Sequence, residues 1–541
     1  MVDTDIRKGE YRKEVGLFGA VFFGSSAILG SAVLFIPVTV LGAAGPAGIL
    51  AWVVGAAIMM VIGLIYIELG TRFPRTGGVG AYPHLSNGPI TGVFNGWGAF
   101  LGYVLAPVSE VVAMVEYLSF FFPSLYNLKV GAMTLSGELL TIFIVFLFFL
   151  GNYFGVKYLN QSNAFLTWLK LLSIAFIGVF FFALYFHPAN FTKFGGFFHY
   201  GGSGFLFAIS TTVYAFAGFR QPIDYGEELR NPRRNIPLAV GLSIVISMFL
   251  YLILSVDFIG SINWHYLSVT QGFTTGVWSD LSSSSFTFPL PAMAFGVGLS
   301  LMAYFIFFTS IHSSASSSLI YSGGAARVLA NLSENRYLPP WFASLSKNGI
   351  PYLSVLVVLL ISAFYTFLIP IFISVALVFV DASLVSYGPA AVSLMVLRRN
   401  VKSKEGSFFL PLAYIFAPIG FVLGSFLIYW TGWEYVKIAI PSVLAGSLLL
   451  IYHYRKRKIK KAELLGGIWY PFYLISVLLL SYIGSSKFGG INLIHYPYDL
   501  LVFAVVSVIF YSLGVISGNH FARKMRERRE PGIFNPFEPS Q

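Results

Sequence analysis

Apolar stretches of about 20 residues, each nearly free of charge, recur along this chain from residue 15 to residue 518. A stretch of this length, wound as an α-helix, is long enough to cross the hydrocarbon core of a bilayer. Only 10% of the residues are charged and 57% are hydrophobic. Soluble domains carry about 25% charged residues. The sequence therefore predicts an all-α polytopic membrane protein and excludes a soluble globular fold.

A sliding window of about 20 residues predicts about fourteen membrane spans. They cover residues 15–40, 45–70, 92–122, 137–156, 162–186, 203–220, 236–260, 289–322, 351–369, 371–397, 408–430, 434–453, 465–484 and 496–518. Only a short Ile-Pro-Ile segment separates the ninth span from the tenth, so these two are the least sharply divided.

Lys and Arg are concentrated on one side of the predicted spans. The N-terminus and alternate connections hold 29 of the 34 basic residues. Basic loops stay in the cytoplasm, so both termini are predicted there, with the protein in the cell membrane. The net charge of +12 does not indicate nucleic-acid binding, because the basic runs at 455–461 and 523–529 directly follow predicted spans. Topology and anionic membrane lipid account for such runs.

The residue types that carry metal or covalent chemistry are sparse. The chain has no Cys, and its eight His residues show no metal-ligand spacing. No nucleophile paired with a base stands out either. The sequence therefore predicts no metal site, no cofactor and no catalytic residue, and a membrane-embedded enzyme is the least favoured function.

Two predicted spans contain residues that interrupt a uniform apolar helix. The first reads GSSAILGSAVLFIP at residues 24–37, and the sixth reads AFAG at residues 215–218 before turning polar. Unpaired backbone in lipid costs several kcal/mol per group, so a break survives where a cavity or a ligand satisfies it. Breaks in spans five apart are typical of inverted-repeat transporters. The alternative is that these small residues only allow close helix packing.

Several longer motifs resemble the amino acid–polyamine–organocation permeases. They are YIELGTRFPRTGG at 66–78, GF at 218–219 continuing to EELRNPRRNIP at 227–237, SGGAAR at 322–327 continuing to LP at 338–339, and LRR at 397–399. The resemblance extends over about residues 12 to 455, and the consistent order and spacing of the motifs make it specific.

This resemblance implies ten core helices in two inverted repeats of five, with helices 1 and 6 broken around the substrate. The implied organisation is a cytoplasmic N-terminus at 1–14, a first five-helix repeat at 15–186, an inverted second repeat at 203–397, accessory helices 11 and 12 at 408–453, two extra C-terminal helices at 465–518 and a basic cytoplasmic tail at 519–541.

The resemblance also implies a substrate site at the two breaks. Backbone amides around the break in span one would bind the α-carboxylate of an amino acid, and carbonyls at both breaks would bind its α-ammonium. The implied substrate-binding residues are Ile28, Gly30, Ser31, Ala32, Tyr214, Phe216, Ala217 and Gly218. Ala32 departs from the family, which usually has Gly there, so a methyl group stands close to the expected carboxylate.

Lys170 lies inside the fifth predicted span, where a charge is costly and is a functional hypothesis by default. It resembles a lysine that takes the place of sodium in some members, which implies proton coupling. The alternative is a structural lysine that reaches the membrane surface or pairs with Glu110 or Glu116. Glu110 itself is expected to line the cavity, where it relays a proton or neutralises a nearby cation.

Arg220 departs from the family, which commonly has Asp or Glu two residues after the Gly of the break. A cation is disfavoured at the start of a half-helix, so Arg220 needs a carboxylate nearby. Asp224 one turn on, Glu110, or the side chain of an acidic substrate could each supply it.

The predicted function is amino-acid transport by alternating access, with proton symport. Amino-acid exchange and a non-transporting amino-acid sensor of the same fold are the alternatives. The residues do not indicate which amino acid binds or what the oligomeric state is.

Overall fold

The structure, a computed structural model, describes residues 9–127, 130–283, 286, 288–368, 382–402, 405–455 and 460–527. Outside the described residues lie 1–8 of the predicted cytoplasmic N-terminus, 369–381 at the junction of the ninth and tenth predicted spans, and 528–541 of the predicted basic tail.

The described chain is almost entirely helical. Its long helices are α1 (Leu17–Ile28), α2 (Ile36–Ala44), α3 (Gly48–Arg72), α4 (Gly78–Asn87), α5 (Pro89–Leu118), α6 (Leu135–Tyr153), α7 (Val156–Tyr185), α9 (Gly201–Ala215), α11 (Pro232–Ser261), α14 (Ser300–Glu334), α15 (Tyr352–Leu368), α17 (Gly388–Asn400), α18 (Ala413–Thr431), α19 (Trp433–Leu444), α22 (Trp469–Ile483) and α23 (Tyr498–Arg526). Shorter elements are α8 (Asn190–Lys193), α10 (Gln221–Asp224), α12 (Trp264–Gln271), α13 (Pro289–Gly296), α20 (Ser447–Tyr454), α21 (Lys461–Gly467) and a two-stranded hairpin of β1 (Tyr126–Asn127) with β2 (Ala132–Met133).

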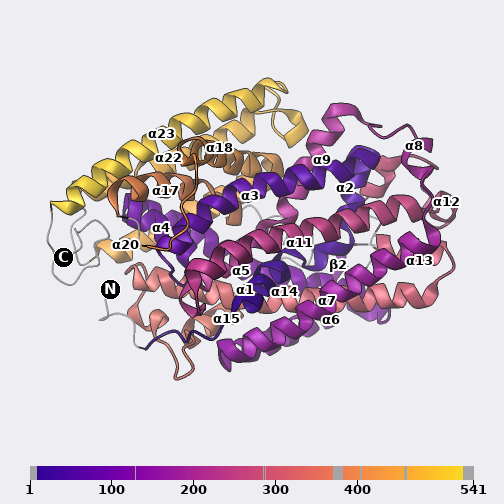
Figure 1. Cartoon of the computed structure of the whole chain (residues 1–541), viewed down its shortest axis with the longest axis horizontal. Coiled ribbons are helices and arrows are strands. Elements are labelled where there is room, and N and C mark those ends of the chain that lie inside the picture. Colours follow the sequence, from indigo (N-terminus) through magenta and orange to yellow (C-terminus); the bar gives the residue numbers. More distant parts are fainter. Residues whose placement is uncertain are drawn as a thin grey trace.

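Ten helical segments in the described chain are long and apolar enough to cross a membrane. Helices α3, α7 and α11 run along the long axis of the elongated bundle (Figure 1). The short helices α8 and α12 gather at one end, and α20 lies toward the opposite end (Figure 1). The polytopic membrane protein that the hydropathy predicts is confirmed, whereas fourteen spans and the inverted repeat remain predictions.

The eighth predicted span, 289–322, is interrupted by a turn that hydropathy did not predict. Its first residues form the separate helix α13, and α14 begins only at Ser300 and continues to Glu334. Gly298 between the two helices has φ +78°, a conformation that suits glycine and ends a right-handed helix. An apolar run alone could not show this turn, because both helices are apolar.

The centre of the bundle is the contact between α5 and α14. The most apolar stretch of α5 is entirely buried, while α7 keeps large apolar side chains such as Phe165 and Leu172 exposed. An apolar surface of this kind is stable against lipid tails rather than water. Helix α5 is thus surrounded by other helices, whereas α7 has one face directed outward.

The family motifs meet near the end of the bundle that carries α20. The buried Arg327 side chain binds the Glu228 carboxylate with two parallel hydrogen bonds of 2.8 and 2.9 Å. Glu68 binds both Arg72, at 3.1 Å, and Arg398, at 2.6 Å. The pairs of Arg327 with Glu228 and of Arg398 with Glu68 join segments that lie far apart in the sequence, so the motifs hold distant segments of the chain together.

Candidate functional site

The first predicted span is broken near its middle. Helix α1 ends at Ile28, Leu29 and Gly30 leave the helical conformation, and a short 3₁₀ turn at Ser31–Leu34 precedes α2. The break leaves the last carbonyls of α1 and the first amides of the next turn without helical partners. The small residues at 24–31 predicted this break, and the structure confirms it.

The sixth predicted span is broken in the same way. Helix α9 ends at Ala215, and a 3₁₀ turn at Ala217–Arg220 leads into α10. The two breaks lie against one another, because a Cβ atom placed on Gly218 would be 2.3 Å from the carbonyl carbon of Ala27. Only a residue without a side chain permits this approach of two backbones.

Hydroxyl groups on one face of α14 satisfy the carbonyls of the first break. Ser313 Oγ lies 2.9 Å from the Leu29 carbonyl and 3.1 Å from that of Gly30. Ser317 donates to Ser26 at 2.7 Å, and Tyr321 donates to Ala27 at 3.4 Å. Residues four apart share one face of a helix, so α14 presents a row of donors to the broken end of α1.

Two tyrosines satisfy carbonyls at the breaks. The Tyr251 hydroxyl of α11 lies 3.1 Å from the Ile28 carbonyl and 3.5 Å from that of Ala215, so it connects both spans. The Tyr387 hydroxyl donates to the Ala217 carbonyl at 2.8 Å. The expected carbonyl ligands Ile28 and Ala217 are therefore each bound by a tyrosine hydroxyl of the protein.

Replacing Tyr251 with Phe should destabilise the junction of the two breaks. The change removes one donor and leaves the buried Ile28 carbonyl unpaired, at a cost of about 1–3 kcal/mol. We expect a lower midpoint of thermal unfolding in detergent. Tyr414→Phe is the matched control, because Tyr414 is 65% exposed. Equal midpoints for the two variants would contradict the role assigned to the Tyr251 hydroxyl.

A backbone amide at the first break is hydrogen-bonded to a carboxylate of the protein. The Ser31 backbone N–H donates to Oε2 of Glu110 at 2.6 Å, and a Cβ on Gly30 would lie 2.0 Å from Oε1 of the same carboxylate. Glu110 comes from α5, and both Glu110 and Ser31 are buried. The start of this turn therefore binds a carboxylate, which here is the protein's own; a substrate carboxylate at the same amide stays a prediction.

Lys170 is fully buried on α7 and faces the end of α1. Its Nζ donates to the Ser26 carbonyl at 3.2 Å, so a charged side chain contacts the backbone next to the first break. Among the described charges, no ion pair joins Lys170 to Glu110 or Glu116, although the Glu110 charge acts on it through space. Lys170 is thus joined to α1 by a hydrogen bond to a backbone carbonyl.

Arg220 is fully buried inside a ring of tyrosines. Its guanidinium carbon lies 4.3 Å from the ring centre of Tyr387, 5.4 Å from Tyr103 and 5.8 Å from Tyr66, which stabilises the cation by cation–π contact. Its Nη1 donates to the Ser386 hydroxyl, whereas Nε and Nη2 have no partner in the described chain.

Asp224 lies one turn beyond Arg220 but binds other groups. Its carboxylate accepts hydrogen bonds from the Tyr103 hydroxyl at 2.6 Å and from the Val79 amide at 3.3 Å. No ion pair between described residues joins Arg220 to Asp224 or to Glu110. Two of the three groups expected to neutralise Arg220 are therefore engaged elsewhere.

The remaining predicted residues are less directly placed at the breaks. The Tyr214 hydroxyl donates to the Leu427 carbonyl of α18 at 2.7 Å, so its side chain is directed toward the accessory helices. Phe216 is buried and packs edge-on against Trp52 and Tyr251. Ala32 is partly buried within the 3₁₀ turn.

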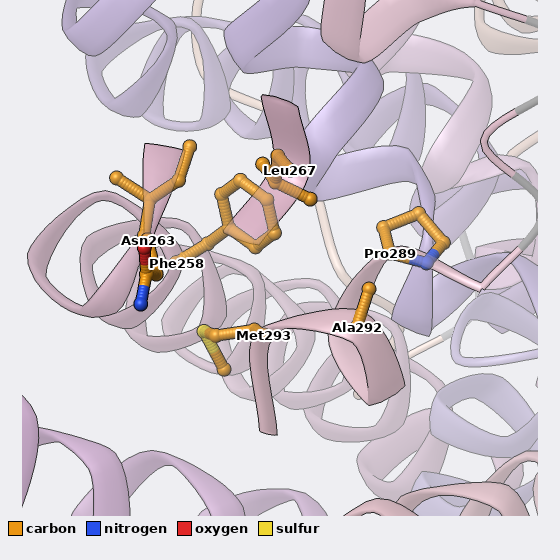
Figure 2. Close-up of a pocket in the computed structure, with 7 residues that line it drawn as sticks. Phe258, Asn263, Leu267, Pro289, Ala292 and Met293 are labelled. Atoms are coloured by element: carbon orange, nitrogen blue, oxygen red, sulfur yellow. The ribbon is translucent and has the colours of Figure 1, made fainter. Parts of the chain in front are cut away.

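A small pocket lies away from both breaks. Figure 2 shows Phe258, Leu267 and Met293 directed into it from the end of α11 and from α12 and α13. Its lining is mostly apolar and includes none of the predicted site residues. We therefore place the functional site at the breaks, where charged and backbone groups converge, and not in this pocket.

The donors from α11 and α14 are the functional residues that sequence analysis missed. A signal was present in HSSASSSL at residues 312–319, because polar side chains within a membrane span face other helices. The tyrosines at 251 and 387 carry no such signal, since single tyrosines are common in apolar helices.

Comparison with known proteins decides the family. The family model described as amino acid permease matches residues 15–453. The chain belongs to this family. The resemblance to the amino acid–polyamine–organocation superfamily is thereby confirmed, and the permease is a transporter rather than an enzyme.

The permease has two full-length relatives in Bacillus subtilis. It is 30% identical to the glutamate/serine transporter AimA over 527 residues, 94% of each chain. It is 32% identical to an aspartate-proton symporter over 514 residues, which cover 93% of the permease and 96% of the relative. The branched-chain amino acid permease BcaP of the same organism is 23% identical over 457 residues, 82% of the permease and 94% of the relative.

Proposed function

We propose that the permease carries amino acids across the cell membrane by alternating access, in symport with protons. The carboxylate bound by the Ser31 amide carries this proposal. A substrate α-carboxylate has the same acceptor atoms as Glu110, so it can take the same amide when Glu110 moves away. The α-ammonium would then lie near the carbonyls of Ile28 and Ala217, in place of the tyrosine hydroxyls.

The proposal also includes the membrane topology of the permease. Residues 15–186 and 203–397 form two inverted repeats, the chain crosses the membrane about fourteen times, and both termini face the cytoplasm. Two contacts support termini on one side. Gly9 lies against Leu345, and Arg526 donates to the Asn400 carbonyl, so the first and last described segments meet loops that the charge distribution assigns to the cytoplasm.

Lys170 is the group we propose to carry the proton. Its Nζ contacts α1 beside the break, so a change in its charge alters the bond that holds the broken helix. One of the full-length relatives is named a proton symporter. Lysine suits this role, because its side chain ends in one amine that can gain or lose a single proton.

Uptake into sealed vesicles tests the proposed function. The purified permease would be reconstituted, an inward proton gradient imposed, and accumulation of radiolabelled glutamate, aspartate, serine and leucine measured. Accumulation that collapses with a protonophore supports symport. Uptake only against a preloaded internal amino acid would show exchange, and binding without uptake would show a sensor.

Arg220 should select substrates with an anionic side chain. Its two unpartnered N–H donors can form a charge-assisted pair with a carboxylate, worth about 1.5–3 kcal/mol. We expect Arg220→Gln to weaken binding of glutamate and aspartate by about tenfold to a hundredfold and to leave leucine binding nearly unchanged. Competition binding measures both.

Arg220→Lys is the matched control for charge. It keeps the cation but loses the planar fork, so it should retain part of the preference for acidic amino acids. An equal loss of glutamate and leucine binding in Arg220→Gln would leave Arg220 as a structural residue within the tyrosine ring.

A further inference from the structure

Helix α7 carries a column of polar side chains that leads to Lys170. Asn160, Asn163, Thr167 and Lys170 follow one another at intervals of three, four and three residues, so they share one face of the helix. The opposite face exposes apolar side chains to lipid. The column therefore faces the interior of the bundle.

Helix α1 lies along this column. At one end, a Cβ on Gly19 would be 2.1 Å from Oδ1 of Asn160, so the asparagine packs directly on the α1 backbone. At the other end, Lys170 Nζ donates to the Ser26 carbonyl. The two helices thus run side by side from Asn160 to the break, and the polar column lies at their contact.

The column is buried but its hydrogen-bonding groups are not satisfied by the described protein. Asn163 and Thr167 are fully buried, yet neither amide atom of Asn163 nor the Thr167 hydroxyl has a protein partner. Oδ1 of Asn160 and Oγ of Ser26 are also buried without a hydrogen-bond partner among the described residues. An unpaired buried polar group costs about 1–3 kcal/mol, and native proteins satisfy such groups with bound water.

The column begins near the protein surface. Asn160 is partly exposed, whereas Asn163, Thr167 and Lys170 are buried. The start of α7 contacts the segment after α14, since Asn348 donates to the Phe154 carbonyl at 3.4 Å. The charge distribution assigns both segments to the cytoplasmic side, so the open end of the column points there.

We propose that water molecules held by Asn160, Asn163 and Thr167 form the path by which Lys170 releases its proton to the cytoplasm. An N–H bond of the Lys170 ammonium breaks, an O–H bond forms on the adjacent water, and the excess proton passes along the column to bulk water. Lys170 is left as a neutral amine. This inference rests on the proposed function, which makes Lys170 the proton carrier.

Other ionisable groups face Lys170 from other helices. Glu110 on α5 and His312 on α14 act on its charge through space. Neither lies on α7, and among the described residues the column itself contains no ionisable group except Lys170. The amide and hydroxyl side chains therefore serve to position water rather than to hold the proton themselves.

The test separates proton movement from substrate movement in the full-length permease. Vesicles containing a pH-sensitive dye would report acidification driven by glutamate entry, and counterflow of labelled glutamate would report exchange without net proton transfer. We expect Thr167→Val and Asn163→Leu to slow glutamate-driven acidification by about tenfold, while counterflow stays near the wild-type rate.

Thr167→Ser is the matched control, because it keeps the hydroxyl and should retain wild-type acidification. Thr167→Val preserves side-chain volume, so it reports on the path even if Asn163→Leu does not fold. Wild-type acidification rates in Thr167→Val, or an equal fall in acidification and counterflow, would overturn the path while leaving symport intact. If the wild type accumulated glutamate without acidifying the vesicles, that result would instead overturn the proposed symport and the path with it; serine or aspartate replaces glutamate in every assay if uptake shows that it is the amino acid carried.

Discussion

Gly218→Ala should abolish transport and strongly reduce the stability of the permease. The added Cβ would lie 2.3 Å from the carbonyl carbon of Ala27 and 2.6 Å from its oxygen. Both are backbone atoms, so this steric clash can be relieved only if the two broken spans move apart. Overpacking of a buried contact costs about 1–3 kcal/mol of stability. We expect a loss near the upper end of this range, because the added methyl group meets backbone, which cannot rotate away as a side chain can. Thermal unfolding in detergent and glutamate uptake in vesicles measure the two effects.

Gly202→Ala is the matched control within the same broken span, in the helix that precedes the break. Gly202 lies in α9, and a Cβ there would meet no atom within 4 Å. We expect this variant to unfold at or above the wild-type temperature, since alanine favours the helix over glycine. Similar behaviour of the two variants would show that the breaks do not depend on close backbone contact.

The second large effect is expected for Lys170→Ala. A pH difference of one unit supplies about 1.4 kcal/mol per proton, or about tenfold accumulation of a co-transported substrate. Removing the proposed proton carrier should abolish this accumulation. Substrate binding should persist, because the proposed ligands belong to α1, α9 and the turns that follow them. Glutamate uptake with and without the imposed gradient, together with equilibrium binding, gives both quantities.

Lys157→Ala provides the control for removing a lysine from α7. Lys157 is exposed at the start of the same helix, so its removal should leave gradient-driven accumulation unchanged. Accumulation by Lys170→Ala to the wild-type level would remove Lys170 from the coupling mechanism.

Local sequence was sufficient to predict the two broken spans. Glycine and serine at 24–31 and the glycine that ends the AFAG stretch at 215–218 are poor helix formers, and α1 and α9 end at Ile28 and Ala215. Hydropathy likewise predicted most of the long helices, because about 20 apolar residues in a row have few alternatives in a membrane. The turn between α13 and α14 was not predicted, since a glycine turn between two apolar helices leaves hydropathy unchanged.

Local sequence could not show what satisfies the breaks. Ser313 and the Leu29 carbonyl it binds are separated by 284 positions, and Tyr251 and Ile28 by 223. Nothing in α1 indicates which helix supplies its donors. The same holds for Glu110, which lies 79 positions from the Ser31 amide. These contacts depend on how the helices pack, which a single sequence does not state.

The row of hydroxyls on α14 also bears on how the broken helix can move. Ser313, Ser317 and Tyr321 follow at intervals of one turn, which is about 6 Å along the axis. A serine hydroxyl can rotate between a neighbouring helix and the carbonyl four residues earlier in its own helix at little cost. A carbonyl of α1 that leaves one donor can therefore reach the next as the helix tilts. Because these donors lie about 6 Å apart, beyond the reach of one hydrogen bond, such an exchange would favour discrete positions of α1 over intermediate ones, where a carbonyl would lack a donor in the low-dielectric interior.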